Sequence, residues 1–402
     1  KNYMYPDLRK GYQISQYDKP ICENGYIEVE NNETKKKIRI NRIHIEEDAG
    51  KLIHMEGNNT YIDYNRCGTP LLEIVSEPDI TSSDEAVLYL TNLKEIFQYL
   101  EVSDCNMEEG SLRCDANISM MVKEGEKWVN TPIVEVKNMN SFKNVKKALE
   151  YEAIRLVEEY NKTKVTNNGK NKVTRGWDDN KEITVFQRTK EGESDYRYFP
   201  EPDLPHLEIT DEIIEVQRKK LPELPKQKKA RFIKEYNITD YDAESLVAQK
   251  DMGFYFESIA KLTKYHKKAA NFILTDVMSI LNQKEIGIKD FSLSKEHIAE
   301  LIDLLGEEKI SSWIGKQLFE KMLKTNKSPK EIMAEENLSQ IDEGDLIKII
   351  DGVLNDNPKS IEDYNNGKDN ALKFLMGQVM KLSKGKANPV RATELILDKI
   401  KK

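Results

Sequence analysis

The sequence predicts an α+β protein whose mixed front part is followed by a helical remainder. Between residues 1 and 210, several short segments alternate apolar and polar side chains with a period of two, as strands do. From Asp211 onward the period is helical and is broken at proline-marked positions. We therefore expect three parts, covering residues 1–210, 211–330 and 331–402.

The expected elements follow in chain order. Asn24-Gly25 is a strong turn signal beside a strand at 26–29, and residues 38–47 and 71–77 alternate as strands. Ser82 or Ser83 is expected to cap a helix over 84–100. Further strands are expected at 107–118, 133–139 and 183–188, and the polar stretch 161–181 as a mobile loop or hairpin. A second helix at 141–160 should turn Ala148, Leu149, Ile154 and Leu156 toward the core.

The composition excludes several protein classes. The chain has 402 residues, of which 33% are charged and 38% hydrophobic, and no apolar run is long enough to span a bilayer. The four cysteines show no C-x-x-C spacing, which argues against a zinc site. No P-loop, kinase motif or G-x-S-x-G elbow occurs, so neither a standard nucleotide fold nor a serine hydrolase is expected.

Charge is distributed unevenly along the chain. Residues 1–210 hold 29 Lys+Arg against 38 Asp+Glu, whereas residues 373–402 hold eight basic and two acidic side chains. An acidic front part repels polyanions unless divalent cations intervene, and a basic tail can bind phosphates. A solvated helix with a lysine-rich end would explain the tail equally well.

The stretch from Met107 to Ile118 carries the most suggestive pattern. As a strand, it places Glu109, Ser111, Arg113, Asp115 and Asn117 on one face and apolar side chains on the other. For this strand alone, an ordinary charged surface is the simpler explanation. Other predicted strands repeat the pattern, however, and these are the strands that carry Glu46 or Glu47, Glu73 with Glu77, and Glu135.

Carboxylates that converge in one sheet repel one another unless a cation lies between them. Oxygen ligands without cysteine suit magnesium or manganese, and His44 could add a nitrogen ligand. Arg113, Lys137 and Arg197 could neutralise phosphates during transfer. The residues thus indicate metal and phosphate chemistry.

Several long motifs give the chain a resemblance to a known family. They include Lys1–Asp7, His44–Lys51, Asp63–Asp79, Val102–Ser119, Val136–Phe142, Asp195–Asp203 and Lys384–Pro389. With these motifs in order, the sequence resembles the B subunit of bacterial and organellar aspartyl/glutamyl-tRNA amidotransferases (GatB) over essentially its whole length.

The resemblance implies a fold and a reaction. The fold would be a cradle domain with a glutamine-synthetase-like antiparallel sheet, then an all-α helical domain and a small YqeY-like tail. ATP with Mg²⁺ would phosphorylate the side-chain carboxylate of Glu-tRNA(Gln) or Asp-tRNA(Asn). Ammonia from the glutaminase A subunit would then displace the phosphate. The resemblance also implies a heterotrimer with A and C subunits in the bacterial cytoplasm, without membrane contact.

The resemblance implies roles for particular residues as well. Glu46, Glu47, Glu73, Asp115, His44 and Glu109 are the expected metal ligands. Lys1, Arg113, Ser111 and Asn138 are expected to bind the nucleotide. The catalytic group is expected to comprise Glu47, Glu73, Asp115, Lys1, Arg113, Glu135 and Lys137. Alternation groups Glu46 with His44 and leaves open which of Glu46 and Glu47 reaches the metal. Lys381, Lys384, Lys386 and Arg391 of the tail are expected to contact tRNA.

The family extends upstream of the segment that matches Lys1, and that portion holds a strand with further acidic and histidine ligands. We therefore expect the 402-residue chain alone to be catalytically crippled. Mg²⁺- and ATP-dependent amidation of Glu-tRNA(Gln) by this chain with A and C subunits would contradict this expectation.

Two other functions compete with the amidotransferase. A glutamine-synthetase-like ligase for a small carboxylic acid would not need a basic helical tail. A non-enzymatic tRNA-binding adaptor would gain nothing from clustered carboxylates. An Asp115→Ala variant tested separately for ATP cleavage and tRNA binding would separate these functions. The choice between Glu-tRNA and Asp-tRNA stays open.

Overall fold

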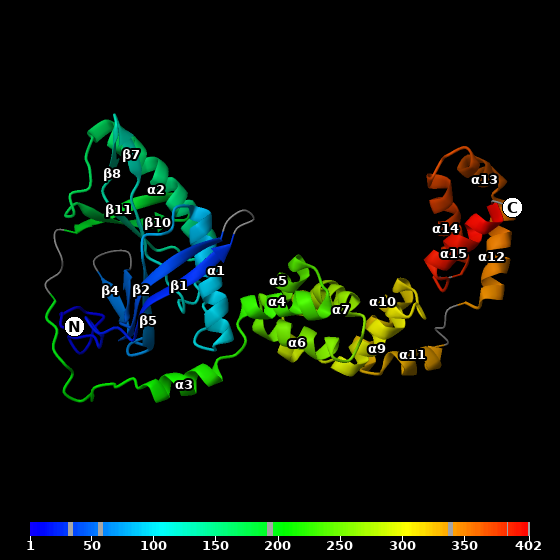
Figure 1. Ribbon diagram of the computed structural model, residues 1–402, viewed down its shortest axis with the longest axis horizontal. Helices are drawn as coiled ribbons and strands as arrows, with labels where there is room; N and C mark the ends of the chain where they lie inside the picture. The colour runs from blue at the N-terminus through cyan, green and yellow to red at the C-terminus, as the bar shows by residue number, and fades with distance from the viewer. Residues whose placement is uncertain (31–34, 55–58, 191–195, 337–340, 384, 401–402) are drawn as a thin grey trace. The chain divides into compact units, whose positions relative to one another are not determined.

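The computed structural model describes residues 1–30, 35–54, 59–190, 196–336, 341–383 and 385–400. The chain divides into two compact units, Lys1–Pro222 and Glu223–Lys402. Strands occur in the first unit and helices fill the second, as the change of sequence period predicts (Figure 1). No helix of the described residues combines the length and apolar character needed to cross a membrane.

The first unit contains a three-stranded antiparallel sheet. Its order is β1 (Cys22–Glu30), β2 (Lys35–Glu47) and β5 (Pro70–Ser76), with β2 in the centre. The long strand β2 pairs with β1 over residues 35–43 and with β5 over residues 40–47. A separate antiparallel pair, β3 (Lys51–His54) and β4 (Thr60–Asp63), follows β2.

A second sheet has the order β11-β10-β9-β6. Its strands are β6 (Ala116–Ile118), β9 (Val134–Lys137), β10 (Lys172–Asp178) and β11 (Ile183–Lys190), and a hairpin of β7 (Met121–Glu124) and β8 (Lys127–Asn130) follows β6. β9 pairs with β10 in parallel, which departs from the antiparallel sheet we expected. The polar stretch 161–181 includes β10, so the hairpin alternative is the correct one. The predicted acids are therefore divided between two sheets rather than gathered in one.

Two helices of the first unit, α1 and α2, begin at serine caps, and the Ser82 cap is one of the two alternatives that the sequence predicts. The Ser82 side chain accepts from Glu85 N at the start of α1 (Ser83–Tyr99), and the Ser141 side chain accepts from Asn144 N at the start of α2 (Phe142–Thr163). Ala148 and Leu156 of α2 are buried as predicted, but Ile154 is 64% exposed, so its predicted core position is wrong.

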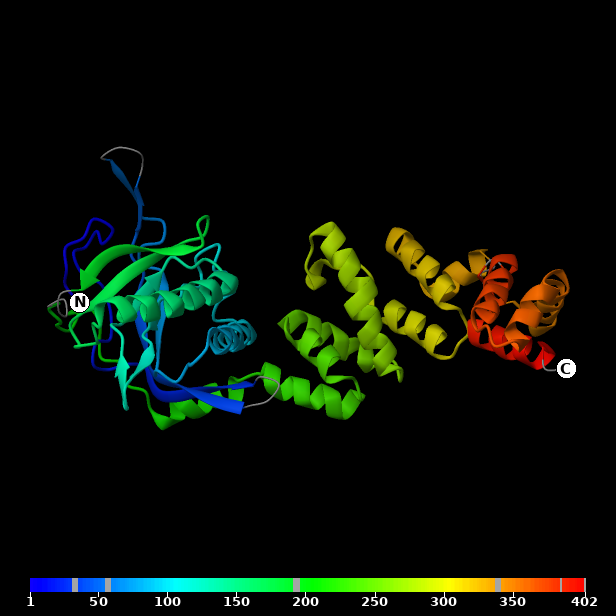
Figure 2. The same cartoon turned by 90° about the horizontal axis from the view of Figure 1, so that it is seen from above.

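One hydrophobic core joins both sheets and both helices. It includes Ile38 of β2, Leu90 of α1, Val136 of β9, Ala148 of α2 and Trp177 of β10. Figure 2 shows α1 and α2 in this part of the molecule. The apolar faces of the strands and helices thus meet in a single interior, which fixes the two sheets relative to each other.

The predicted strand at 107–118 is wrong over most of its length. Residues 107–112 form turns and bends, and only Ala116–Ile118 is a strand. Gly110 has a φ of 82°, which breaks an extended chain, and Ser111 N donates to Asn106 O at 3.0 Å to close the turn. The expected common face of Glu109, Ser111 and Arg113 therefore does not exist.

After the strands, α3 (Asp211–Lys220) ends the first unit and helices make up the second. These are α4 (Pro225–Tyr236), α5 (Asp240–Val247), α6 (Lys250–Ala260), α7 (His266–Phe272), the π-helix η1 (Ile273–Val277), α8 (Met278–Lys284), the 3-10 helix η2 (Ile288–Asp290), α9 (Lys295–Gly306), α10 (Ser312–Thr325), α11 (Pro329–Glu336), α12 (Glu343–Asp356), α13 (Pro358–Asn365), α14 (Asn370–Leu382) and α15 (Pro389–Ile400). Two separate cores lie within this unit, one from Phe232 to Ile332 and one from Leu346 to Ile396.

Candidate metal and phosphate site

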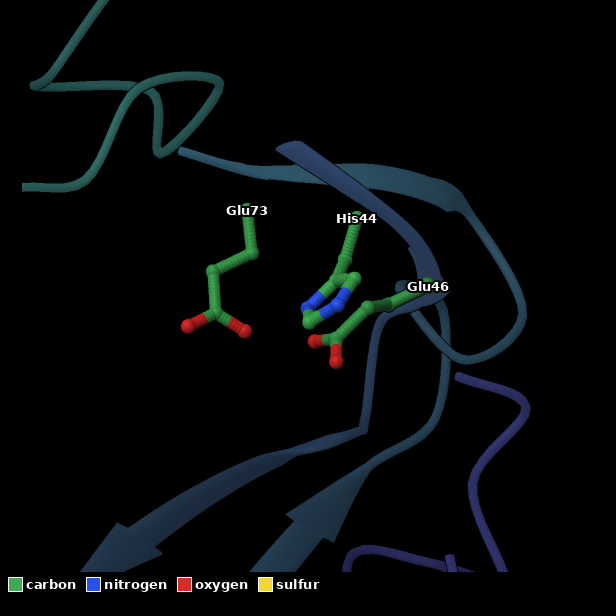
Figure 3. A group of neighbouring side chains, drawn as sticks. All are labelled: His44, Glu46 and Glu73. Carbon is green, nitrogen blue, oxygen red and sulfur yellow. The ribbon is translucent and has the colours of Figure 1, made fainter. Parts of the chain in front are cut away.

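Three potential metal ligands meet where β2 pairs with β5. His44 and Glu46 are two residues apart on β2 and share a face, and the register places Glu73 of β5 opposite His44. One donor atom from each residue lies within 4.8 Å of the others. Figure 3 shows the imidazole and both carboxylates directed toward a common space. We call these three residues the triad.

His44 provides the test of whether a metal fits the triad. The residue is 6% exposed, and its Nε2 atom is buried without a hydrogen-bond partner among the described residues. A buried polar atom without a partner is costly, and imidazole nitrogen is a common metal ligand. Coordination of a divalent cation by Nε2 and the two carboxylates would satisfy this atom, so the residues present fit a metal.

The two carboxylates of the triad differ in their surroundings. Ser15 Oγ donates to Glu46 Oε1 at 2.6 Å, and Gln13 Nε2 donates to Glu46 Oε2 at 3.4 Å, so Glu46 is held in place. Burial raises the pKa of Glu73, and the nearby charge of Glu46 raises it further. A cation between these two carboxylates would relieve their repulsion.

Glu47 lies apart from the triad although it follows Glu46 directly. Its Oε1 atom accepts from Ile14 N at 2.9 Å and forms an ion pair with Lys10. Successive side chains of a strand point to opposite faces, which explains the separation. Of the two glutamates that the sequence left as alternatives, the geometry groups Glu46 with His44 and Glu73.

A second group of expected site residues belongs to the other sheet. Asp115 directly precedes β6 and forms an ion pair with Lys137 at the end of β9. Glu135, also on β9, is 8% exposed and accepts from Thr174 Oγ1 at 3.0 Å. Sheet pairing thus brings Asp115 to Lys137, while Glu135 contacts β10.

Arg113 is fixed by an acidic partner. Its Nη2 atom donates to Asp48 Oδ2 at 2.6 Å, and Arg66 Nε lies 3.2 Å from the same oxygen. Asp48 is 9% exposed, so one buried carboxylate orients two guanidinium groups. This pairing holds Arg113 beside the loop that follows β2.

The remaining expected residues lie outside the helices and strands. Glu109 is exposed and Ser111 Oγ accepts from Asn106 N at 2.8 Å, within the turn described above. Asn138 directly follows β9 with a φ of 64°. Lys1 Nζ lies 4.4 Å from the ring centroid of Tyr196. None of these four belongs to the triad.

The expected tRNA-binding residues lie in the tail. Lys381 is exposed on α14, and Lys386 follows that helix. Arg391 of α15 forms ion pairs with Glu343 and with Glu394, the latter at 3.0 Å. Lys384 lies outside the described residues. The guanidinium of Arg391 is therefore partly neutralised, whereas Lys381 is exposed on its helix.

Sequence reasoning missed the residues that hold the triad from the N-terminal side. Gln13 and Ser15 contact Glu46, and their spacing of two in an extended segment is the one signal that places both on a single face. The aromatic residues Tyr17 and Tyr198 also stack here, and no local pattern predicts that contact.

Comparisons with known proteins give consistent results. The family model described as GatB/GatE catalytic domain matches residues 1–215, and the model described as GatB domain matches residues 254–400.

Curated relatives resemble the whole chain. It is 47% identical over 405 residues to the B subunit of aspartyl/glutamyl-tRNA(Asn/Gln) amidotransferase from Borrelia hermsii, covering 100% of this chain and 84% of the relative. The protein of the same name from Borreliella burgdorferi strain ZS7 is 48% identical over 404 residues, with 100% and 83% coverage. That from Caldicellulosiruptor bescii is 49% identical over 409 residues, with 100% and 84% coverage.

Proposed function

This chain belongs to the GatB family of amidotransferase B subunits, and from that premise we propose that it activates a tRNA-linked carboxylate for amidation. The family's enzyme is a glutamine-dependent carbon–nitrogen ligase that acts in protein biosynthesis. The substrate would be Glu-tRNA(Gln) or Asp-tRNA(Asn), and the product Gln-tRNA(Gln) or Asn-tRNA(Asn).

The proposed chemistry has two steps that balance. A side-chain carboxylate oxygen bonds to the γ-phosphorus of ATP, and ADP leaves as the P–O bond breaks. Ammonia then bonds to the acyl carbon and loses one proton, the acyl C–O bond breaks, and inorganic phosphate leaves carrying that proton. Activation is needed because a carboxylate is a poor electrophile, whereas an acyl phosphate carries a good leaving group.

The observation that carries the proposal is the triad, whose His44 Nε2 atom has no hydrogen-bond partner in the described part of the chain. We propose that His44, Glu46 and Glu73 hold Mg²⁺, which when bound supplies positive charge for the phosphates. Glu47, Glu109 and Asp115 stay predictions as further ligands.

The basic residues would supply the remaining positive charge. Lys137 and Arg113 are each oriented by a carboxylate, and oriented cations stabilise developing phosphate charge without reorganising. Lys1 is proposed to bind the nucleotide, together with Ser111 and Asn138. Glu135 is proposed to complete the catalytic group.

The finer fold and domain predictions belong to this proposal. The shared core of two sheets, α1 and α2 supports a glutamine-synthetase-like cradle at residues 1–210. The two separate cores of the second unit support a helical domain at 211–330 and a YqeY-like tail at 331–402. The basic residues of that tail are proposed to bind tRNA.

The partners would be a glutaminase A subunit and a C subunit, acting in the bacterial cytoplasm. A stretch from Phe199 to Leu221, including α3, supports this part of the proposal. Eight of its large apolar side chains are exposed: Phe199, Leu204, Leu207, Ile209, Ile213, Ile214, Val216 and Leu221. Because the stretch directly follows Tyr198 and ammonia must reach the site, we assign it to the A subunit.

The test measures three quantities on this chain, joined to the upstream portion that the resemblance implies and assembled with A and C subunits. Glu73→Gln, His44→Ala and Asp115→Ala variants are compared for ATP cleavage, tRNA amidation and tRNA binding. We expect loss of cleavage and amidation with tRNA binding largely kept. Cleavage that survives all three substitutions would contradict the proposed site, and an unsubstituted complex that binds tRNA without ATP chemistry would favour the adaptor.

A further inference from the structure

We propose that Tyr17 and Tyr198 form a stacking platform for an adenine base beside the triad. The inference rests on the proposed function, since both substrates of that reaction carry adenine. ATP contains an adenine. An aminoacyl-tRNA also presents one near the reacting group, because its amino acid is attached to the 3′-terminal adenosine. The two sources share one chemistry, an adenine on a ribose.

The first observation is an exposed aromatic stack. The ring centroids of Tyr17 and Tyr198 are 4.0 Å apart with 17° between the ring planes, so the rings lie nearly parallel. Tyr17 is nevertheless 59% exposed and Tyr198 is 36% exposed. Two large rings that stack at the surface leave aromatic area open to a further flat ring.

The second observation is the backbone of Tyr17. Its φ is 43°, in the left-handed region that bulky side chains rarely adopt. The residue lies in a turn that Lys19 N closes by donating to Gln16 O at 2.8 Å. A tyrosine at such a position is conformationally costly, and such strain concentrates at functional sites.

The third observation is how firmly this turn is attached to the triad. Gln16 Oε1 accepts from Ile45 N of β2 at 2.7 Å and from Ile21 N at 3.1 Å. Ser15, two residues before Tyr17, donates to Glu46 at 2.6 Å. Hydrogen bonds to Ile45 and to Glu46 thus fix the turn that carries Tyr17.

Tyr198 reaches the same place from the other end of the unit. Asn2 N donates to Arg197 O at 2.9 Å, which fixes the segment that bears Tyr198. Burial raises the pKa of Tyr198, and the charges of Tyr17, Glu46 and Glu73 add to that increase.

A cation next to the platform favours a nucleotide over an uncharged aromatic ligand. Lys1 Nζ lies 4.4 Å from the ring centroid of Tyr196, two residues before Tyr198. The arrangement places a stacking surface, an ammonium group and the triad together. The stacking surface would bind the base of a nucleotide, the ammonium group would bind a phosphate, and a metal on the triad would bind a further phosphate.

The experiment measures binding to the B subunit assembled with A and C subunits. One probe is a non-hydrolysable ATP analogue, and the others are tRNA(Gln) with and without its terminal adenosine. Tyr17→Ala and Tyr198→Ala remove a ring, and Tyr17→Phe and Tyr198→Phe keep it. Tyr241→Ala removes a tyrosine that is 78% exposed in the second unit and serves as the matched control.

We expect both alanine variants to weaken one adenine probe about tenfold, because a base loses its stacking partner. The phenylalanine variants and Tyr241→Ala should bind as the unsubstituted protein does. Weakened ATP-analogue binding assigns the platform to ATP. Weakened binding of intact tRNA, with truncated tRNA unaffected, assigns it to the terminal adenosine.

Unchanged affinity of both alanine variants for all three probes would overturn the platform. Equal weakening by the alanine and phenylalanine variants would do so too, because the ring would then not be the cause. The proposed function fails separately, when the unsubstituted complex, joined to the upstream portion that the resemblance implies, cleaves no ATP in the presence of its tRNA. Binding of the probes does not require that cleavage, so the two failures are distinguishable.

Discussion

Glu46 and Glu47 are consecutive residues of β2 whose carboxylates are held by different partners. Ser15 Oγ donates to Glu46, whereas Lys10 and the Ile14 amide hold Glu47. Strand alternation separates the two side chains, and only Glu46 lies with His44 and Glu73. The relationship makes the choice between the two glutamates testable.

We expect Glu46→Gln to weaken Mn²⁺ binding by about tenfold or more, because it removes a charged oxygen ligand. Glu47→Gln should leave the affinity near that of the unsubstituted protein, since its amide oxygen can still accept from Ile14 N. Calorimetric titration with Mn²⁺ measures both affinities. Stronger loss in Glu47→Gln than in Glu46→Gln would show that the metal lies on the other face of β2.

A second prediction concerns an ionic network in the helical unit. Lys228 is 1% exposed, and its Nζ lies 3.1 Å from Glu257 Oε2, while Arg231 Nη1 lies 3.0 Å from Glu257 Oε1. Burial alone would raise the pKa of Glu257, but hydrogen bonds from Arg231 and Lys228 outweigh it and lower the pKa to about 2.

Because the folded-state pKa of Glu257 is below its ordinary value of 4.5, the unfolded state binds the proton first. This contribution to stability is complete above about pH 4.5 and is lost as the pH falls toward about 2. We expect Glu257→Ala to lower the free energy of unfolding by about 3–5 kcal/mol at pH 7, because Lys228 then stays buried without its partner.

Thermal unfolding at several pH values measures this effect, and the difference between the two proteins should shrink toward pH 2. Glu244→Ala is the control, since its ion pair with Lys229 is solvent-exposed and should contribute about 1 kcal/mol or less. A Glu257→Ala protein as stable as the control would contradict the prediction.

The tail offers a comparison of two basic residues. Lys381 is exposed on α14, whereas Arg391 is paired with Glu343 and Glu394. If the tail binds tRNA, Lys381→Gln should reduce the slope of log affinity against log salt by about 0.7–0.9, the effect of one lost phosphate contact. Arg391→Gln should reduce it less, because two carboxylates already oppose that charge. Filter binding over a salt series measures both slopes, and equal slopes in all three proteins would exclude a phosphate role for the two residues.

The elements that the sequence predicts well are those with local signals. Ser82 and Ser141 mark the starts of α1 and α2 because a capping side chain bonds to the helix it begins. His44 and Glu46 share a face because alternation within one strand is also local. These features need no knowledge of the rest of the chain.

The errors arise where distant segments or a single backbone torsion decide the structure. Gly110 turns the chain inside a segment that alternates like a strand, so Glu109 and Ser111 lose their expected face. Asp115 pairs with Lys137 in a different sheet from Glu73. The sequence of a single strand does not determine which other strand it pairs with. The stack of Tyr17 on Tyr198 joins residues far apart in sequence, so no local sequence pattern predicts it either.

The last prediction concerns the apolar stretch around α3. No residue of α3 is buried, and Ile213 and Ile214 are each 41% exposed. Substituting an exposed surface residue that belongs to no core usually changes stability by about 0.5 kcal/mol or less. An Ile214→Glu variant should therefore unfold as the unsubstituted chain does.

The same variant should lose association with the A subunit, because a carboxylate is costly to bury in an apolar interface. Co-purification and sedimentation of mixed subunits measure the association. Ile154→Glu is the matched control, since Ile154 is 64% exposed on α2, outside the stretch. Loss of the C subunit alone would assign the surface to that partner instead, and an intact complex with both variants would show that this stretch binds neither subunit.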